Sequence, residues 1–217
     1  MSKCGVTDLM LTPHYVEESD FVCNNKEKKS IYNKLVNKAK KEEIDINLYL
    51  GNEVFFTENM LDLIKKDEIM TLNNSKYILF EFPLNSLYKN FRTIISELIS
   101  KGYTPILAHP ERYIMFHKHP ELAADYVRMG VLLQGNTPSL FGKYGRISEK
   151  TLKFFLKKGW ITVMGSDTHH SYENISEKKL RRKLYRITKD DDYVERILNT
   201  NFDKIINDDV MEIKRFN

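Results

Sequence analysis

The chain has 217 residues, of which 41% are apolar and 29% are charged, so we expect a single soluble globular domain over residues 1–217. Its 34 basic and 30 acidic residues leave a net charge of +4, which argues against nucleic acid as a partner. The lysines spread along amphipathic segments and indicate solvated helix faces. No apolar run could span a membrane, no signal segment is present, and there are only two cysteines. We therefore expect a cytoplasmic protein without a membrane span or a disulfide framework.

Short apolar runs rich in Val, Ile, Leu, Tyr and Phe predict six strands. In chain order these runs are Thr7–Thr12, Ile46–Gly51, Tyr77–Phe82, Thr104–Ala108, Val131–Gln134 and Ile161–Gly165. Amphipathic segments between and after them predict helices over Asn25–Glu43, Thr57–Lys66, Ser86–Lys101, Pro120–Met129, Ser148–Lys158 and, in one or two pieces, Ser176–Thr200. This alternation favours parallel strands joined by right-handed crossovers and buried on both faces. The predicted fold class is therefore α/β.

Side chains with metal-binding chemistry follow five of the six predicted strands. They are His14, Glu53, Glu81, His109, Asp167 and His169. A single Glu or His at such a place is more often solvated or structural, but parallel barrel-like folds collect all their carboxyl strand ends at one mouth, where active sites lie. Imidazoles and carboxylates together suit Mn²⁺, and also Fe or Zn²⁺, and two or three such ions can assist phosphoryl transfer. The coincidence of five strand ends predicts a metal centre.

Arg112 lies three residues after His109, so it is the candidate for binding a phosphate group at the same mouth. Other hydrolytic mechanisms are disfavoured. A cysteine-dependent tyrosine phosphatase needs an Arg at a fixed short spacing after its Cys, and neither Cys4 nor Cys23 has one. The sequence also has no Gly-x-Ser-x-Gly elbow and no Walker-type lysine loop.

The segments around these residues resemble those of a known family. They are Gly5–Tyr15, Gly51–Phe56, Phe80–Phe82, Ala108–Tyr113 and Gly165–His170. The strings Ala-His-Pro-Glu-Arg-Tyr and Ser-Asp-x-His, in this order, are quite specific. From about Cys4 to Thr200 the chain is similar to the manganese-dependent protein-tyrosine phosphatases of the PHP superfamily that occur in capsular and exopolysaccharide operons.

The resemblance implies a distorted (β/α)7 barrel with a trinuclear Mn²⁺ site. It implies metal-ligand roles for His14, Glu53, Glu81, His109, Asp167 and His169, with Glu53 and Glu81 as bridging carboxylates and Arg112 holding the phosphate. The implied reaction is hydrolysis of phosphotyrosine without a phospho-enzyme. The implied partner is the Tyr-rich tail of a bacterial tyrosine autokinase that controls polysaccharide chain length.

Two other functions stay open. One is a small-molecule phosphomonoesterase of the same superfamily, such as the histidinol-phosphate type. The other is a catalytically silent, truncated relative that still binds a kinase tail. The sequence also leaves the native metal and the formation of a homo-oligomer open.

One motif of the family has no counterpart before His14. The family opens with a strand that carries Asp-x-His-x-His, and no His-x-His precedes His14. We therefore expect a barrel without its first strand. The favoured explanation is that Met1 is an internal Met of a longer reading frame. The loss of a central strand would leave backbone groups of its neighbours unpaired and so impair folding. A natural truncation and a site with fewer ligands are the alternatives.

Overall fold

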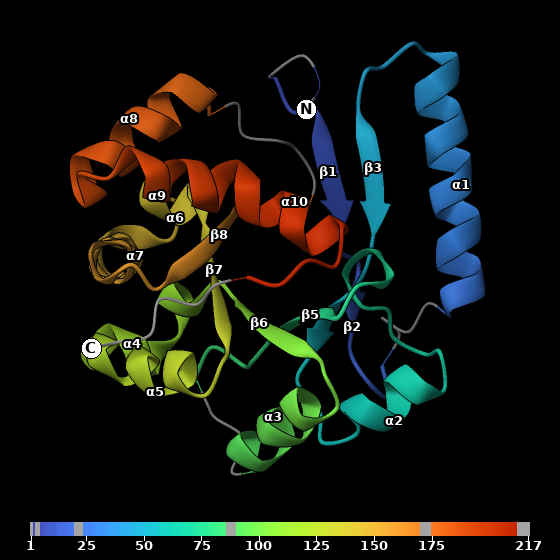
Figure 1. The fold of residues 1–217 in the computed structure, drawn as a ribbon, viewed down its shortest axis with the longest axis horizontal. Coiled ribbons are helices and arrows are strands. Elements are labelled where there is room, and N and C mark those ends of the chain that lie inside the picture. Colours follow the sequence, from blue (N-terminus) through green and yellow to red (C-terminus); the bar gives the residue numbers. More distant parts are fainter. Residues whose placement is uncertain (1, 3–4, 20–23, 86–89, 170–174, 212–217) are drawn as a thin grey trace.

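The computed structural model describes residues 2, 5–19, 24–85, 90–169 and 175–211 (Figure 1). Cys4, Cys23, Ser86 and His170, which enter the sequence predictions, lie outside these residues.

Every pair of hydrogen-bonded strands in the described residues is parallel. The strands are β1 (Asp8–Leu11), β2 (His14–Tyr15), β3 (Asn47–Leu50), β4 (Glu53–Phe55), β5 (Tyr77–Glu81), β6 (Thr104–Ala108), β7 (Leu132–Asn136) and β8 (Ile161–Gly165). β1 pairs with β3, and the others form a six-stranded sheet in the order β2-β4-β5-β6-β7-β8. The predicted α/β class with parallel strands is confirmed.

Two of the predicted strands continue beyond an interruption. The first breaks at Pro13, which has no N–H to donate to a neighbouring strand, and the second breaks at Gly51 and Asn52. The Asn52 Nδ2 donates to the Pro13 carbonyl (2.8 Å) and holds the two segments side by side. β2 and β4 then pair with His14 opposite Glu53. These two site residues therefore lie within short strands, which corrects the expectation that both follow a strand end.

This interruption requires glycine at position 51, because the neighbouring chain leaves no space there for a side chain. A Cβ at this position would lie 2.8 Å from the Leu72 Cδ2, 3.0 Å from the Leu72 Cα and 3.2 Å from the Thr71 carbonyl oxygen. We expect Gly51→Ala to lower the free energy of unfolding by about 1–3 kcal/mol, since backbone atoms must move to relieve the overlap. Urea denaturation measures this change, and an unaltered midpoint and slope would contradict the expectation.

Helices surround the sheet and follow the predicted alternation. They are α1 (Asn25–Lys41), α2 (Met60–Lys65), α3 (Phe91–Ser100), α4 (Ile114–Lys118), α5 (Ala123–Arg128), α6 (Thr137–Leu140), α7 (Gly145–Lys158), α8 (Glu177–Thr188), α9 (Asp191–Glu195) and α10 (Asn201–Ile206). Short 3-10 turns cover Leu72–Asn74, Pro110–Arg112 and Pro120–Leu122, and a π turn covers Arg196–Thr200. None of the helices in the described residues is both long and apolar enough to cross a membrane.

Local sequence signals explain some of the helix ends. The side chain of Asn24 caps α1, and Gly159 ends α7 in the left-handed conformation (φ 68°). The prediction for α2 was wrong at its start, because the helix begins at Met60 and Thr57 is not its cap. The Thr57 hydroxyl instead accepts a hydrogen bond from the Asn59 N–H (3.2 Å), which forms the turn before the helix.

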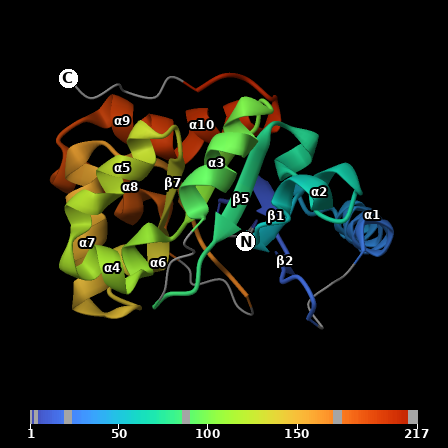
Figure 2. The ribbon, with the colours of Figure 1, turned by 90° about the horizontal axis from the view of Figure 1, so that it is seen from below.

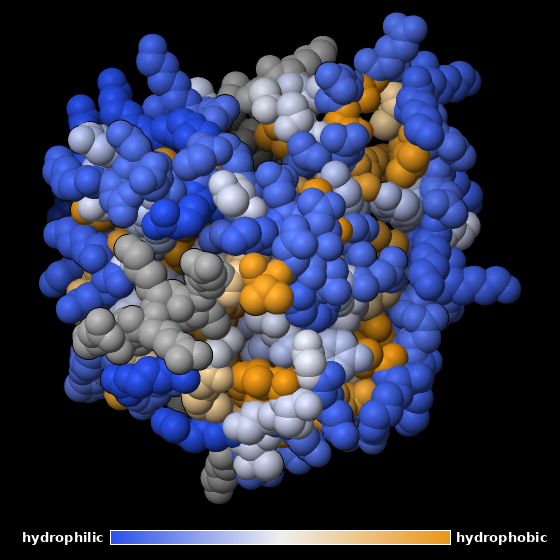
Figure 3. All heavy atoms as spheres, viewed as in Figure 1, coloured by the Kyte–Doolittle hydropathy of each residue, from blue (hydrophilic) through white to orange (hydrophobic). Residues whose placement is uncertain are grey.

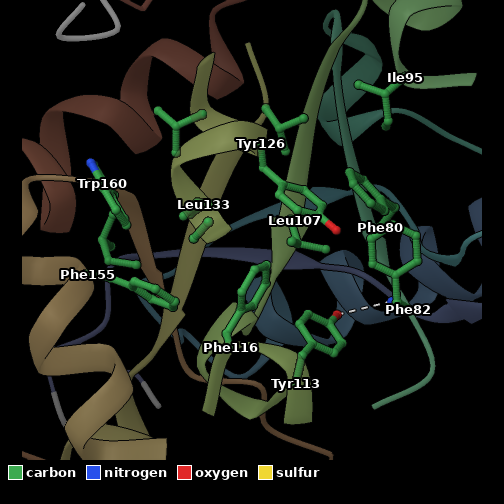
Figure 4. Close-up of a cluster of buried hydrophobic side chains, with 14 of the residues drawn as sticks. Phe80, Phe82, Ile95, Leu107, Tyr113, Phe116, Tyr126, Leu133, Phe155 and Trp160 are labelled. Carbon is green, nitrogen blue, oxygen red and sulfur yellow. Dashed lines mark hydrogen bonds between the residues drawn. The ribbon is translucent and has the colours of Figure 1, made fainter. Parts of the chain in front are cut away.

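The sheet is buried on both faces, as apolar parallel strands require. Alternate residues of each strand point to opposite sides: Phe80 and Leu107 join a large cluster with the surrounding helices, whereas Leu79 and Ile106 join a smaller one with Ile205 of α10. Figure 4 shows aromatic rings of the larger cluster packed edge to face. This packing fixes the strands and hence the residues at their carboxyl ends.

α10 contacts both the last strand of the six-stranded sheet and the separate β1–β3 pair. The Asn201 Nδ2 donates to the Thr162 carbonyl of β8 (2.7 Å), and Phe202 packs edge-on against Tyr49 of β3 with ring centroids 5.8 Å apart. In Figure 1, α10 lies between β8 and the β1–β3 pair. No hydrogen-bonded ladder joins β8 to β1 within the described residues, and α10 packs between these two sheets.

Candidate metal centre

A buried imidazole lies between two glutamates that come from neighbouring strands. The His109 Nε2 is 3.1 Å from the Glu53 Oε1 and 3.3 Å from the Glu81 Oε2. The other oxygen of Glu81 is 3.1 Å from the Nδ1 of His14. Ligand atoms of His14, Glu53 and Glu81 all lie within 4.8 Å of one another, which is the spacing of a group that can hold a metal ion.

The second part of the site follows β8. The Nε2 atoms of His14 and His169 are 2.8 Å apart, with the rings stacked at a centroid distance of 5.0 Å. The His169 Nδ1 in turn lies 3.4 Å from the Asp167 Oδ1. Contacts therefore run without a gap from Glu53 at one end to Asp167 at the other, and they include all six residues that the sequence analysis proposed as ligands.

The imidazoles and carboxylates of this cluster shift one another's pKa values. Burial opposes the charged form of His109, but hydrogen bonds with Glu53 and Glu81 outweigh it and raise the pKa of His109 to about 9. A hydrogen bond with Glu81 also raises the pKa of His14. Burial alone would raise the pKa of Glu81, but hydrogen bonds with His109 and His14 prevail and lower it to about 2. Both carboxylates attract positive charge to this point of the fold.

Two residues of the cluster adopt a backbone conformation that is unusual outside glycine. His109 has φ 35° and Asp167 has φ 47°. Such a conformation costs on the order of 1 kcal/mol for a residue with a side chain, and residues of this kind gather at functional sites. His109 directly follows β6 and Asp167 lies two residues after the end of β8, so the packed sheet fixes their positions.

Arg112 lies beside Asp167 and faces the same mouth. Its Nη1 donates to the Asp167 Oδ2 (2.7 Å), and its guanidinium carbon lies 4.3 Å from the centre of the Tyr144 ring. The side chain is 21% exposed, which leaves donors of the planar guanidinium open to an incoming anion. The structure thus brings Arg112 into the same neighbourhood as the six candidate ligands.

The sequence analysis missed Asn136 and gave no role to Glu111. The Asn136 Nδ2 donates to the Asp167 Oδ2 (2.9 Å), next to the bond from Arg112. The fully buried Glu111 accepts a hydrogen bond from the Asn136 N–H (3.1 Å), and burial raises the pKa of the Glu111 carboxyl. Asn136 ends β7, two residues beyond the predicted strand end, and this position at a strand end was the signal that could have identified it.

Tyr113 joins the two strand ends that carry Glu81 and His109. Its hydroxyl donates to the Ala108 carbonyl (3.0 Å) and accepts a hydrogen bond from the Phe82 N–H (3.1 Å; Figure 4). Burial raises the pKa of Tyr113 well above its usual value, so the hydroxyl keeps its proton. The side chain therefore fixes the spacing between two candidate ligands.

Tyr113→Phe is expected to lower the free energy of unfolding by about 1–3 kcal/mol, because it leaves a buried N–H and a buried carbonyl without their shared partner. Urea denaturation measures the loss. Tyr103→Phe is a suitable control, because the Tyr103 hydroxyl makes no hydrogen bond within the described part of the chain. Equal stability of Tyr113→Phe and the wild type would show that the hydroxyl does not join the strands energetically.

The fold and the site together define a class of protein. It is a parallel α/β protein with a cluster of histidines and carboxylates at one edge of its strands, within β2 and β4 and at the ends of β5, β6 and β8. A family model described as capsular polysaccharide synthesis, CpsB/CapC, matches residues 1–207. The chain therefore belongs to the CpsB/CapC family of capsular polysaccharide synthesis.

Relatives of known name agree with this family. The chain is 33% identical over 166 residues to the putative tyrosine-protein phosphatase CapC of Staphylococcus aureus. This match covers 76% of this chain and 64% of the relative. It is 31% identical over 137 residues to the tyrosine-protein phosphatase CpsB of Streptococcus pneumoniae. This match covers 61% of this chain and 56% of the relative. The chain thus spans less than two thirds of the length of either relative.

A solved structure shares the fold. It belongs to the crystal structures of YwqE from Bacillus subtilis and CpsB from Streptococcus pneumoniae, which were described as unique metal-dependent tyrosine phosphatases. The match has a TM-score of 0.86 and 22% identity, and it covers 97% of this chain and 84% of that one. This likeness confirms the predicted fold class.

Proposed function

We propose that the chain is a metal-dependent phosphomonoesterase that hydrolyses phosphotyrosine in proteins. The observation that carries this proposal is the continuous cluster of four imidazole and carboxylate side chains, His14, Glu53, Glu81 and His109, with Arg112 close by. The relatives named above as tyrosine-protein phosphatases support the same reaction.

The donor set fits a divalent cation with mixed oxygen and nitrogen preference. The ligands proposed are His14, Glu53, Glu81, His109, Asp167 and His169. The carboxylates of Glu53 and Glu81 lie beside the imidazoles of His109 and His14. A bound cation would balance the negative charge of the same two carboxylates. Among common metals Mn²⁺ suits this set, and Fe or Zn²⁺ would also bind such ligands. Two or three bound ions would supply an activated water and a clamp for the phosphoryl oxygens.

The chain itself would bind and orient the substrate. Arg112 can pair with two oxygens of a phosphate group, while Asp167 and Tyr144 keep its guanidinium in place. Asn136 holds the other side of the Asp167 carboxylate. Glu111, Asn136 and Tyr113 would thus position the residues that contact the phosphate and the metal.

The proposed partner is the phosphotyrosine-containing tail of a bacterial tyrosine autokinase. Membership of a capsular polysaccharide synthesis family supports a substrate from that machinery. Dephosphorylation of the tail would then regulate capsule or exopolysaccharide synthesis.

Substrate comparison tests the proposal against its alternatives. With Mn²⁺ present, the chain should hydrolyse a phosphotyrosine peptide with a kcat/KM well above that for histidinol phosphate. The reverse preference would identify a small-molecule phosphatase. Retention of a phosphotyrosine peptide in a pull-down, with no metal-dependent turnover of either substrate, would identify a catalytically silent binding protein.

A further inference from the structure

A hollow lined by basic side chains lies between α6, α7 and α8, apart from the metal centre. It is an open hollow with a volume of about 390 Å³, and we call it the basic groove. It is lined by Phe141, Lys153, Lys179, Arg182, Lys183, Arg186 and Ile187. The surface over α8, at the upper left of Figure 3, is strongly hydrophilic. Five of the seven lining residues are cationic, so the groove favours an anionic ligand.

The fold concentrates positive charge on these helices. α7 and α8 together carry eleven basic and two acidic residues, a net charge of +9, whereas the whole chain carries +4. The remaining residues therefore carry −5. The expectation that lysines only form scattered solvated faces is revised for this part of the surface, because two basic helix faces meet at one hollow.

Within the described residues, Glu149 is the carboxylate that pairs with cations lining the groove, while Glu177 and Glu195 pair with Arg181. Glu149 lies 2.8 Å from the Lys153 Nζ and 3.1 Å from the Lys183 Nζ, and Lys153 and then Lys183 lower the pKa of its carboxyl. Arg182 and Arg186 form no ion pair with any described residue. In the part of the chain that the structure describes, no carboxylate competes with a ligand for these two guanidinium groups.

The groove has a fixed apolar floor. The Lys183 Nζ lies 4.6 Å and the Lys179 Nζ 5.1 Å from the centre of the Phe141 ring. Leu184 is fully buried and anchors α8 to the core. The basic side chains therefore project from elements that the core holds in place.

One turn of chain connects the groove with the candidate active site. Phe141 directly follows α6, and Tyr144 lies three residues later, directly before α7. The Tyr144 ring contacts the guanidinium of Arg112, the residue proposed to bind the substrate phosphate. A peptide with its phosphotyrosine at Arg112 could therefore extend along Phe141 into the groove.

We propose that the basic groove binds anionic side chains that flank the phosphotyrosine of a peptide substrate, either carboxylates or a second phosphotyrosine. This inference rests on the proposed function and adds a substrate preference to it. A membrane surface fits less well, because the cations surround a concavity and Tyr185 is the only large exposed apolar side chain in the described residues of α8.

The test compares two double variants of equal charge. Arg182→Glu with Arg186→Glu reverses two cations of the groove. Lys34→Glu with Lys41→Glu makes the same change on α1, at the opposite side of the molecule in both ribbon views (Figures 1 and 2). Each variant is assayed with Mn²⁺ on four substrates: a phosphotyrosine peptide flanked by glutamates, the same peptide with glutamines, a peptide with a second phosphotyrosine in place of the glutamates, and phenyl phosphate.

The groove variant should lower kcat/KM for the two anionic peptides by about tenfold, mainly through KM, since focused charge governs their capture. Its activity on phenyl phosphate and on the glutamine peptide should stay unchanged, and the α1 variant should act like the wild type on all four. The two anionic peptides distinguish carboxylates from phosphotyrosine as the preferred anion. Equal losses on phenyl phosphate, or no loss on either anionic peptide, would overturn the inference.

A binding assay separates this inference from the proposed activity. Fluorescence anisotropy follows the glutamate peptide with a non-hydrolysable phosphonate analogue of phosphotyrosine. Weaker binding only by the groove variant supports the groove even if no hydrolysis is detected, in which case the proposed function alone fails. If instead the groove variant loses only its binding to phosphatidylglycerol vesicles, with peptide binding intact, the groove inference is overturned in favour of a membrane surface.

Discussion

Replacing Glu53 with glutamine should reduce metal-dependent phosphotyrosine hydrolysis by at least about 100-fold. Glu53 is buried, it lies 3.1 Å from His109, and its carboxylate belongs to the group of ligand atoms within 4.8 Å of one another. Glutamine keeps the size of the side chain but removes the negative charge that a cation needs. The measurement is kcat/KM on a phosphotyrosine peptide at fixed Mn²⁺, together with the metal content of the purified protein by mass spectrometry.

Glu97→Gln is the matched control for this change, because Glu97 is an exposed carboxylate on α3. It should leave both the rate and the metal content unaltered. Full activity of Glu53→Gln with normal metal content would remove Glu53 from the proposed metal centre. A lower metal content with a native circular dichroism spectrum is the expected signature of a lost ligand.

Arg112→Lys should lower kcat/KM for the phosphotyrosine peptide by about 10²–10³-fold while the metal content stays normal. Lysine keeps the positive charge, but it cannot offer two parallel donors to a phosphate or stack on the Tyr144 ring as a planar guanidinium does. The same kinetic assay measures the loss, and metal analysis distinguishes it from the effect expected at Glu53.

Arg128→Lys provides the comparison for Arg112, since Arg128 is an exposed Arg that pairs with Asp125 on the surface. This variant should retain wild-type activity. If Arg112→Lys also retained activity, phosphate recognition would have to come from another cation, and Arg112 would serve only to hold Asp167.

Most strands could be predicted from the sequence because apolar β-branched and aromatic runs are a local signal. β6 and β8 have the predicted bounds, and β5 differs by a single residue. β2 and β4 could not be predicted, since they follow Pro13 and Gly51, residues that normally end a strand. Only the pairing of His14 with Glu53 across the sheet shows that the strands resume.

The candidate site could be anticipated because its residues share one rule, their position near the carboxyl ends of parallel strands. That rule works for charged or imidazole side chains, which stand out against an apolar strand. It missed Asn136, a neutral amide whose role depends on its contact with Asp167. It also could not find Tyr113, because the two groups that its hydroxyl joins, at Phe82 and Ala108, lie far apart in the sequence.

The basic groove shows a similar limit. Each helix alone has the alternation of basic and apolar residues expected of a solvated surface helix. The concentration of charge arises only when α7 and α8 pack side by side, and this packing is a long-range property of the fold.

Metal titration of phosphotyrosine hydrolysis tests the central claim most directly. The chain is first treated with a chelator and dialysed, and the initial rate on a phosphotyrosine peptide is then followed as Mn²⁺ is added. The proposed centre predicts a rate that starts near zero, rises to saturation with Mn²⁺ and falls again when chelator is returned. A folded chain whose rate is the same in chelator and in saturating Mn²⁺ would contradict the assignment of this cluster as a catalytic metal centre.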